Sequence, residues 1–371
     1  MEFSVKKSDF LRELSLTQGV IEKKTTVPIL ANLLLESHKN HVDISATNLE
    51  LGVLLRCEAK VIEEGSCTVP AKRLWEIIRA LPDAEIKLKS IKNHWVQLTC
   101  ERSTFKLAGM ERENFPALPK LPETSATLPA GVLLKTIDKT IYAISTEESR
   151  YTLNGALMIL KPDAVTMVAT DGHRLTHLEH QASIKGLDHE MRILVPKKAM
   201  GELQRMLNEV GKDLPVEFFR EENHIFFRVG GRLLTSRMST GQFPNYEAVL
   251  PSGNDRVLEL DSGLIWAAVR RVALLADERS HGIRFQVSEG RLEVSSSSGD
   301  YGEAREMLEI KYEKEPIEIG FNFKYLLDFF GSLDGEGIIA LELKDEHSAG
   351  QLRPIGDLPY RYRYVVMPMR M

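Results

Sequence analysis

The sequence predicts an α+β protein made of three copies of one module, each with two helices packed on antiparallel sheets. Three observations predict this fold class. A basic helical segment recurs at a constant spacing, similar strand and helix patterns surround each copy of it, and two turn-rich stretches separate the copies. A period that several features share is typical of repeated architecture, whereas one short match could arise by chance.

The clearest repeat surrounds Lys72, Lys198 and Lys324, which follow one another at intervals of 126 residues. In the first two copies a Val-Pro pair precedes the lysine, and an acid, an arginine and a leucine follow it at matching positions. The third copy is more diverged, but it keeps the acid four residues after the lysine and the final leucine. The three segments are residues 69–81, 195–207 and 321–333.

Two stretches rich in turn-forming residues predict linkers between the copies. Residues 118–129 are rich in Pro, Ser and Thr, and residues 251–255 read Pro-Ser-Gly-Asn-Asp. We therefore expect three modules, at residues 1–125, 126–251 and 252–371.

Within each module we expect a short strand, a helix, a strand pair, a second helix and closing strands. Ser8 can cap the first helix, and the equivalent helices cover residues 129–144 and 262–276. The second helix of each module is the repeated lysine segment. Gly230-Gly231 predicts a hairpin turn between closing strands. The expected strands are residues 30–35, 42–46, 155–160, 165–169, 224–229, 233–238, 283–287 and 291–295. Residues 347–362 read as irregular.

Basic side chains recur on the expected helices. Lys72, Glu76 and Arg79 share one helical face at i, i+4 and i+7, opposite an apolar face. An ion-paired, solvated face is the ordinary interpretation for one such helix. Equivalent basic faces on neighbouring modules would instead form one surface that suits a phosphate backbone without sequence specificity. The basic residues on these helices are Arg12, Lys72, Arg73, Arg79, Lys135, Lys139, Lys197, Lys198, Arg205, Arg270, Arg271 and Lys324.

Bulk composition excludes several classes of protein. The net charge of -5 over 371 residues argues against DNA binding by overall attraction, although a local basic surface remains possible. No apolar run is long enough for a membrane span, and no apolar signal core opens the chain. Cys57, Cys67 and Cys100 show no metal-ligand pairing, which favours a reducing cytoplasm without disulfides. We expect no metal and no cofactor.

Three motifs resemble the bacterial DNA sliding clamps, the beta subunits of the replicative DNA polymerase III holoenzyme. They are Thr-Val-Pro-Ile-Leu at residues 26–30, Ala-Thr-Asp-Gly-His-Arg-Leu at residues 169–175 and Tyr-Val-Val-Met-Pro-Met-Arg-Met at residues 364–371. The resemblance runs the length of the chain. It implies a clamp fold in which one chain forms half of a ring, a head-to-tail homodimer that encircles DNA, and a role as a processivity factor in DNA replication rather than as an enzyme.

The resemblance also implies the partners. They are double-stranded DNA held without sequence specificity, a second copy of the chain, the polymerase alpha subunit, a clamp loader, and repair and translesion polymerases, with no membrane partner. The loader would supply the ATPase, because this chain has no Walker-type phosphate loop.

The family has a hydrophobic pocket between the second and third modules that receives short partner peptides. An apolar, methionine-containing cleft suits such adaptable binding. Ala248 departs from the family, which commonly carries an arginine there, so the motif preference stays open. The matching positions are Leu153, Thr170, Gly172, His173, Arg174, Leu175, Pro244, Val249, Val365, Met367, Pro368, Met369 and Arg370.

Two further sets of residues follow from the resemblance. Thr152 stands where some members carry a second tyrosine, which weakens the expected aromatic contact to DNA beside Tyr151. The second set would form the dimer contact. It consists of Phe and Leu residues, which at these spacings usually belong to a core, but an exposed edge strand can be protected by pairing with a strand of another subunit. The expected DNA contacts are Lys24, Lys72, Arg73, Arg79, Arg150, Tyr151, Lys198 and Arg205. The expected dimer contacts are Phe105 and Leu107 against Leu274 and Leu275.

Two other functions stay open at this point. Asp171-Gly172-His173 could belong to a metal or acid–base site, although Asp-Gly is more often a structural turn and no catalytic partners stand nearby in sequence. The chain could also bind DNA openly as a monomer. We expect no catalytic residue.

Overall fold

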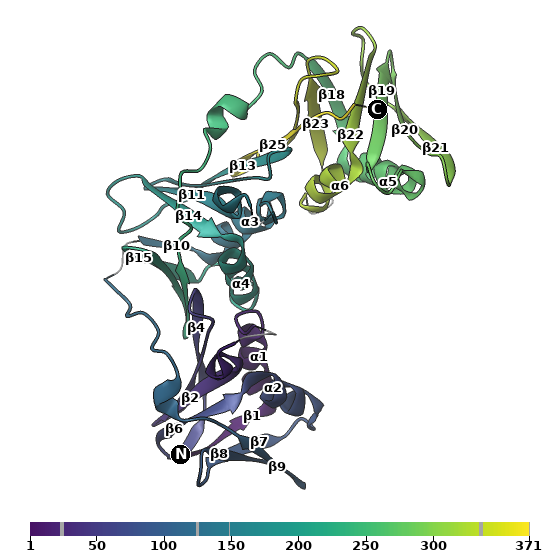
Figure 1. Ribbon diagram of the computed structural model, residues 1–371. Coiled ribbons are helices and arrows are strands. Elements are labelled where there is room, and N and C mark those ends of the chain that lie inside the picture. The colour runs from purple at the N-terminus through teal and green to yellow at the C-terminus, as the bar shows by residue number, and fades with distance from the viewer. Residues whose placement is uncertain (23–25, 124–125, 148, 334–336, 371) are drawn as a thin grey trace. The chain divides into compact units, whose positions relative to one another are not determined.

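The computed structural model describes residues 1–22, 26–123, 126–147, 149–333 and 337–370 (Figure 1). The chain divides into two compact units. The first comprises Met1–Leu134, Ile184–Leu187 and Lys198–Met238, and the second comprises Lys135–Ser183, Asp188–Lys197 and Ser239–Met371. No helix in the described ranges is long and apolar enough to cross a membrane.

The first unit contains two antiparallel sheets. Their strands are β1 (Glu2–Lys6), β2 (Asn32–His38), β3 (His41–Thr47), β4 (Leu51–Glu58), β5 (Lys60–Glu63), β6 (Gly65–Pro70), β7 (Glu85–Ser90), β8 (Trp95–Cys100), β9 (Ser103–Ala108), β10 (Ala126–Pro129), β15 (Pro215–Glu221), β16 (His224–Val229) and β17 (Arg232–Arg237). The smaller sheet has the order β5-β1-β7-β8-β9, and the larger has the order β10-β15-β16-β17-β4-β3-β2-β6.

The second unit also contains two antiparallel sheets, of eight and four strands. Its strands are β11 (Gly155–Lys161), β12 (Ala164–Thr170), β13 (Arg174–Gln181), β14 (Met191–Pro196), β18 (Arg256–Asp261), β19 (Gly282–Ser288), β20 (Arg291–Ser298), β21 (Gly302–Glu309), β22 (Ile317–Asn322), β23 (Ile338–Leu343), β24 (Gly350–Pro354) and β25 (Tyr360–Val366). The larger sheet has the order β14-β11-β12-β13-β25-β24-β23-β18, and the smaller has the order β21-β20-β19-β22.

Two four-strand patterns recur three times in these sheets. One is β6-β2-β3-β4, repeated as β14-β11-β12-β13 and β22-β19-β20-β21. The other is β1-β7-β8-β9, repeated as β10-β15-β16-β17 and β18-β23-β24-β25. The predicted fold class, three repeated modules of helices on antiparallel sheets, is therefore confirmed.

Six α-helices occur in the described part of the chain, two for each copy of the pattern. They are α1 (Lys7–Thr17), α2 (Ala71–Ala80), α3 (Ala130–Asp138), α4 (Lys197–Asn208), α5 (Ser262–Val272) and α6 (Phe323–Gly331). The repeated lysine segments form α2, α4 and α6, each directly after a strand end. On α2 the predicted division of faces holds: Leu74 and Ile78 are buried while Lys72, Arg73 and Arg79 are exposed.

Each eight-stranded sheet contains one joint between modules. In the first unit β17 pairs with β4, and Leu234 lies opposite Val53. In the second unit β25 pairs with β13, and Tyr364 lies opposite Thr176. The strands at the equivalent positions of the smaller sheets, β9 and β21, are edge strands.

The two joints are stabilised by different chemistry. At the first, Arg232 on β17 donates to both carboxylate oxygens of Glu13 on α1, at 2.8 and 2.6 Å, and both side chains are buried. At the second, Tyr362 on β25 donates to the Lys139 carbonyl at 2.7 Å, and its hydroxyl lies 2.5 Å from that of Tyr142. Burial raises the pKa of Tyr362, so this phenol stays protonated and able to donate.

Some predicted helix ends differ from the structure. Ser8 does not cap the first helix, which begins at Lys7 without a side-chain cap. The helices expected over residues 129–144 and 262–276 end at Asp138 and Val272, and a short 3₁₀ turn follows each. The apolar residues after each helix end keep the helical spacing even though the helix is interrupted there. The sequence pattern alone therefore overestimates the length of both helices. These turns are η3 (Ile141–Ala143) and η6 (Ala273–Leu275). Residues 347–362 contain β24 and the start of β25, where an irregular segment was expected.

Candidate functional site

The turn at Asp171-Gly172 carries several of the residues predicted to line a peptide pocket. Asp171 Oδ1 accepts hydrogen bonds from the backbone N–H groups of His173 and Arg174, at 2.9 and 3.0 Å. Gly172 has a φ of 91°, in the left-handed region that favours glycine. The Asp171 carboxylate is therefore occupied in shaping the turn, and this geometry favours a structural role over the metal or acid–base alternative.

The C-terminal segment lies beside this turn and crosses to the third module. The Met367 N–H donates to the His173 carbonyl at 2.9 Å, and the Met369 N–H donates to the Gly320 carbonyl at 2.8 Å. Met367 is exposed, whereas Pro368 and Met369 are half-buried. Backbone bonds at alternate residues hold the segment extended, so its apolar side chains form a fixed ridge.

An apolar cluster forms the floor beneath the ridge. Leu175 and Val365 are almost fully buried in it, and Tyr246 packs against them from η5 (Tyr246–Val249). Val249 is 44% exposed and Met367 is 43% exposed. The predicted set therefore divides into a buried floor and exposed residues that a ligand could cover. Pro244 is also exposed, Thr170 is buried at the end of β12, and Leu153 is half-buried on η4 (Tyr151–Leu153).

Arg174 is already fully engaged within the protein. Its side chain is only 9% exposed, and it pairs with Asp171 at 2.9 Å and with Asp328 at 2.5 Å. Its guanidinium also donates to the Tyr142 carbonyl and lies 4.5 Å from the centre of the Tyr325 ring. Burial alone would lower the pKa of Arg174, but Tyr364 and the two carboxylates outweigh it and raise that pKa. Arg174 therefore holds the turn in place, with little of its charge available to a ligand.

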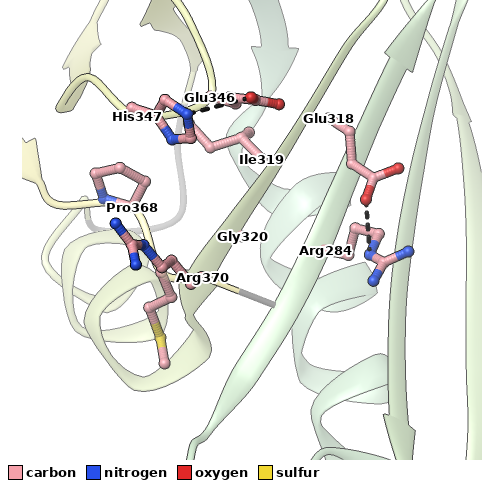
Figure 2. A pocket seen from close by; sticks show the side chains of 9 residues that line it. Arg284, Glu318, Ile319, Gly320, Glu346, His347, Pro368 and Arg370 are labelled. Atoms are coloured by element: carbon pink, nitrogen blue, oxygen red, sulfur yellow. Dashed lines mark ion pairs between the residues drawn. The ribbon is translucent and has the colours of Figure 1, made fainter.

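A cavity of about 570 Å³ borders the ridge at Pro368, Met369 and Arg370 (Figure 2). Arg284 and Glu318, on neighbouring strands, form an ion pair at 3.2 Å on one side, and His347 lies 3.3 Å from Glu346 on another. The full lining is Arg284, Glu318, Ile319, Gly320, Glu346, His347, Pro368, Met369 and Arg370. Three of these were predicted pocket residues. The other six were not predicted. Long-range contacts bring them to the C-terminal segment, among them the pairing of Met369 with Gly320.

The predicted DNA contacts on the helices differ in how available they are. Lys72 and Arg73 are highly exposed, and their ion pairs with Glu76, at 3.9 and 3.0 Å, are of the weak solvent-exposed kind. Lys198 is half-exposed, 3.9 Å from Glu22. Arg205 instead donates to Glu202 and to the Ser15 carbonyl, so it also links α4 to α1. Arg79 is exposed above the Trp75 ring.

The remaining predicted contacts lie on loops. Tyr151 is 65% exposed. Its neighbour Arg150 is half-buried, paired with Glu147 at 2.9 Å and donating to the Asp171 carbonyl. Lys24 falls outside the described residues.

Two lysines expected on the basic helix faces are less available than predicted. Lys139 is 1% exposed, follows the end of α3, and donates to the Ser332 carbonyl at 2.5 Å with its ammonium above the Tyr360 and Tyr362 rings. Lys197 donates to the Ile144 carbonyl at 2.9 Å, and burial lowers its pKa. The prediction of an exposed basic side chain was wrong at Lys139, which the tyrosines of the second joint cover, whereas Lys197 is half-buried.

The predicted dimer contacts lie on or beside the two edge strands. Phe105 and Leu107 are half-buried on β9. Leu274 is 79% exposed on η6, which contacts β21. Leu275 is half-buried. Leu274 therefore lies exposed beside one of the two edge strands, where the predicted dimer contact places it.

Comparison with known proteins agrees with this architecture. Residues 1–119, 127–245 and 247–370 match the models described as the N-terminal, central and C-terminal domains of the DNA polymerase III beta subunit. The chain is 33% identical to the beta sliding clamps of Pseudomonas putida and of Escherichia coli strain K12, each over 374 residues and the full length of both chains.

Solved structures are equally similar. A sliding clamp from Pseudomonas aeruginosa bound to griselimycin has a TM-score of 0.92 at 32% identity, and one from Bartonella birtlesii bound to griselimycin has 0.92 at 34% identity. Both comparisons cover all of this chain and all of the other.

Proposed function

The chain belongs to the beta sliding clamps, the beta subunits of DNA polymerase III, and on that premise we propose that two copies close head to tail into a ring around duplex DNA. It is a DNA sliding clamp and thus a processivity factor rather than an enzyme. Each chain contributes three modules, at residues 1–125, 126–251 and 252–371, and forms half of the ring. The ring works in the cytoplasm, where the chromosome is replicated.

The observation that carries this proposal is the repeated joint. At both joints within the chain, the last strand of one module pairs with the fourth sheet strand of the module before it, as β17 does with β4 and β25 does with β13. β9 and β21 are the same two strands at the two ends of the series, and both are edge strands. A second copy provides the missing partners, so β9 of each chain pairs with β21 of the other.

The internal repeat also predicts the register of this joint. Phe105 occupies on β9 the position that Leu234 occupies on β17, and Ala304 occupies on β21 the position of Val53 on β4. Leu234 lies opposite Val53, so Phe105 should lie opposite Ala304 of the other chain. The same register sets Lys106 opposite Glu303, a favourable pair of opposite charges. Leu274 lies beside β21 and is covered by the joint.

Helix residues contact the DNA backbone in this proposal. Lys72, Arg73, Arg79 and Lys198 are exposed and can attract phosphates without reading bases. Lys24, Arg150, Tyr151 and Arg205 are the further proposed contacts. Encirclement rather than affinity holds the protein on DNA, so weak contacts are sufficient and permit sliding.

The first test is retention on closed and open DNA. Clamps loaded by a bacterial clamp loader and ATP onto nicked circular DNA should stay bound through gel filtration, and a single cut by a restriction enzyme should release them. Proteins bound at both ends of the cut DNA should restore retention, because they block sliding off the ends. Equal loss from nicked circles and free linear DNA would show open binding by a monomer and reject the ring.

The peptide pocket tethers the partners: the polymerase alpha subunit, the clamp loader, and repair and translesion polymerases. We propose that the ridge and its surroundings receive the apolar anchors of their binding motifs. Met367 and Val249 offer exposed apolar surface over the buried floor, and the methionines can adapt to different anchors. The thirteen positions that match the family pocket are the proposed lining, with Arg174 and Thr170 in supporting positions.

Replacing Met367 and Met369 together with glutamine should weaken binding of a fluorescent peptide that carries a polymerase clamp-binding motif by at least about tenfold. The loss of apolar contact from two side chains exceeds the roughly 1.4 kcal/mol that a tenfold change requires. Fluorescence anisotropy measures the affinity. Met238→Gln, a half-buried methionine outside the pocket, is the matched control. Unchanged affinity in a double variant that is still dimeric would show that the pocket is misplaced.

A further inference from the structure

The hairpin of β2 and β3 carries two histidines and a carboxylate on one face. His38 ends β2 and His41 begins β3, and the two lie opposite each other across a two-residue turn. Asp43 follows two residues later, so it shares their face of the sheet. His41 Nε2 lies 3.6 Å from Asp43 Oδ1, and His38 Nε2 lies 3.8 Å from Asp43 Oδ2. One ligand atom from each of the three residues lies within 4.8 Å of the others.

We propose that His38, His41 and Asp43 form a binding site for a divalent transition metal such as Zn²⁺. Two imidazole nitrogens and one carboxylate oxygen are a common set of zinc ligands. Ligands held about 2.0–2.2 Å from a tetrahedral zinc lie roughly 3.3–3.6 Å apart. The imidazoles therefore need to close by about an ångström. His38 is exposed and His41 is half-buried, so small side-chain rotations can supply this movement.

A hydrogen bond to His41 already orients its ring for this role. His41 Nδ1 lies 3.0 Å from the side-chain oxygen of Asn40, which can only accept a hydrogen bond. This contact favours the tautomer with its proton on Nδ1, which leaves the Nε2 lone pair directed at the triad. Histidine ligands of metals usually have such a partner on their other nitrogen.

Arg56 should weaken metal binding at this site, but it leaves ligand positions on Asp43 open. Its Nε and Nη2 atoms donate to Asp43 Oδ1 and Oδ2 at 2.9 and 3.2 Å. A carboxylate has about four acceptor positions, so each oxygen keeps one that Arg56 does not use. The positive charge of Arg56 opposes a cation, while Glu58, opposite His41 on β4, favours one. With three protein ligands, a zinc ion would keep a position for water.

This site is independent of the proposed clamp function. The expectation of no metal rests on the three cysteines, which show no metal-ligand pairing. The spacing His-x-x-His-x-Asp over a hairpin was the signal that could have found it.

Zinc binding by the full, tag-free chain tests the proposal. Isothermal titration with ZnCl₂ should give one ion per chain, and zinc should raise the melting temperature because it binds the folded state. His38→Gln and His41→Gln should each weaken binding by at least about tenfold, as ligand loss does. His94→Gln is the matched control, since His94 is also an exposed histidine, 3.8 Å from Glu111. It should bind zinc like the unmodified chain.

Arg56→Gln provides a second, opposite test. Removing the positive charge should strengthen zinc binding several-fold if Asp43 is a ligand, and circular dichroism checks that each variant is folded. Mg²⁺ should not compete, because it prefers octahedral oxygen ligands. If folded His38→Gln and His41→Gln chains bind zinc as the unmodified chain does, or if the chain binds no zinc, the proposal is wrong.

Discussion

Replacing Glu13 with leucine should lower the free energy of unfolding of the first unit by about 3–5 kcal/mol. The Glu13 and Arg232 side chains are 3% and 9% exposed, and two charge-assisted hydrogen bonds join them. The substitution leaves the Arg232 guanidinium buried without its counter-ion. The cost is that of an uncompensated buried charge, which exceeds the net contribution of the pair itself. Because the pair joins α1 to β17, the substitution should destabilise the packing at the first joint.

Tryptophan fluorescence can isolate this unit during urea unfolding. Trp75 and Trp95 lie in the first unit and Trp266 in the second, so Trp266→Phe removes the signal of the second unit. In that background, Glu13→Leu should lower the urea midpoint strongly. Adding Arg232→Met should recover most of the loss, because an apolar pair of similar size replaces the buried ions. Glu209→Leu, at an exposed position on the same unit, is the control. If Glu13→Leu alone lowers the free energy of unfolding by less than about 1 kcal/mol, the expected cost of the unpaired buried charge is wrong.

The second large effect concerns the joint between chains. Leu274→Asp should convert the dimer to monomer at micromolar concentration, because it places an unpaired carboxylate in an apolar interface. The ring has two identical joints, so the substitution acts twice. Leu274 is 79% exposed in the single chain, which means that its replacement should not disturb the fold. Leu264→Asp is the matched control, since Leu264 is 62% exposed but lies on α5 outside the proposed contact.

Sedimentation velocity distinguishes the two assemblies by mass, near 41.9 kDa for one chain and twice that for the dimer. A dimeric Leu274→Asp variant would place the joint elsewhere. The register has its own test: Lys106→Glu should weaken the dimer by like-charge opposition to Glu303, and Glu303→Lys in the same chain should restore it. Lys60→Glu, on the opposite edge of the same sheet as β9, should have no effect. If Lys106→Glu weakens the dimer and Glu303→Lys does not restore it, the predicted register is wrong. That result would not reject the pairing of β9 with β21.

The repeat was readable from the sequence because it lies in local patterns. Apolar spacing around Lys72, Lys198 and Lys324 predicts helices, and the structure has α2, α4 and α6 there. Whether a single side chain is exposed or buried could not be predicted in the same way. Lys139 fits a solvent-exposed face by spacing, yet Tyr360 and Tyr362 cover it, and they lie more than 200 residues later.

The candidate pocket shows the same division. The resemblance located the ridge at Met367 and Met369 and the turn at Gly172. The charged side of the cavity, with Arg284, Glu318 and His347, meets the ridge through long-range pairings such as that of Met369 with Gly320. No local pattern encodes such a pairing, because it is set by how strands from distant segments meet.

The edge strands β9 and β21 have a further consequence in the proposed ring. The strands of the joints within a chain are tethered covalently, so they meet at a high effective concentration, of the order of millimolar for short linkers. Pairing of β9 with β21 has no tether and depends on how much protein is present. Dilution or an applied pull therefore separates these strands first, without unfolding any sheet. The proposed ring therefore has two gates, at the two joints that no covalent link closes.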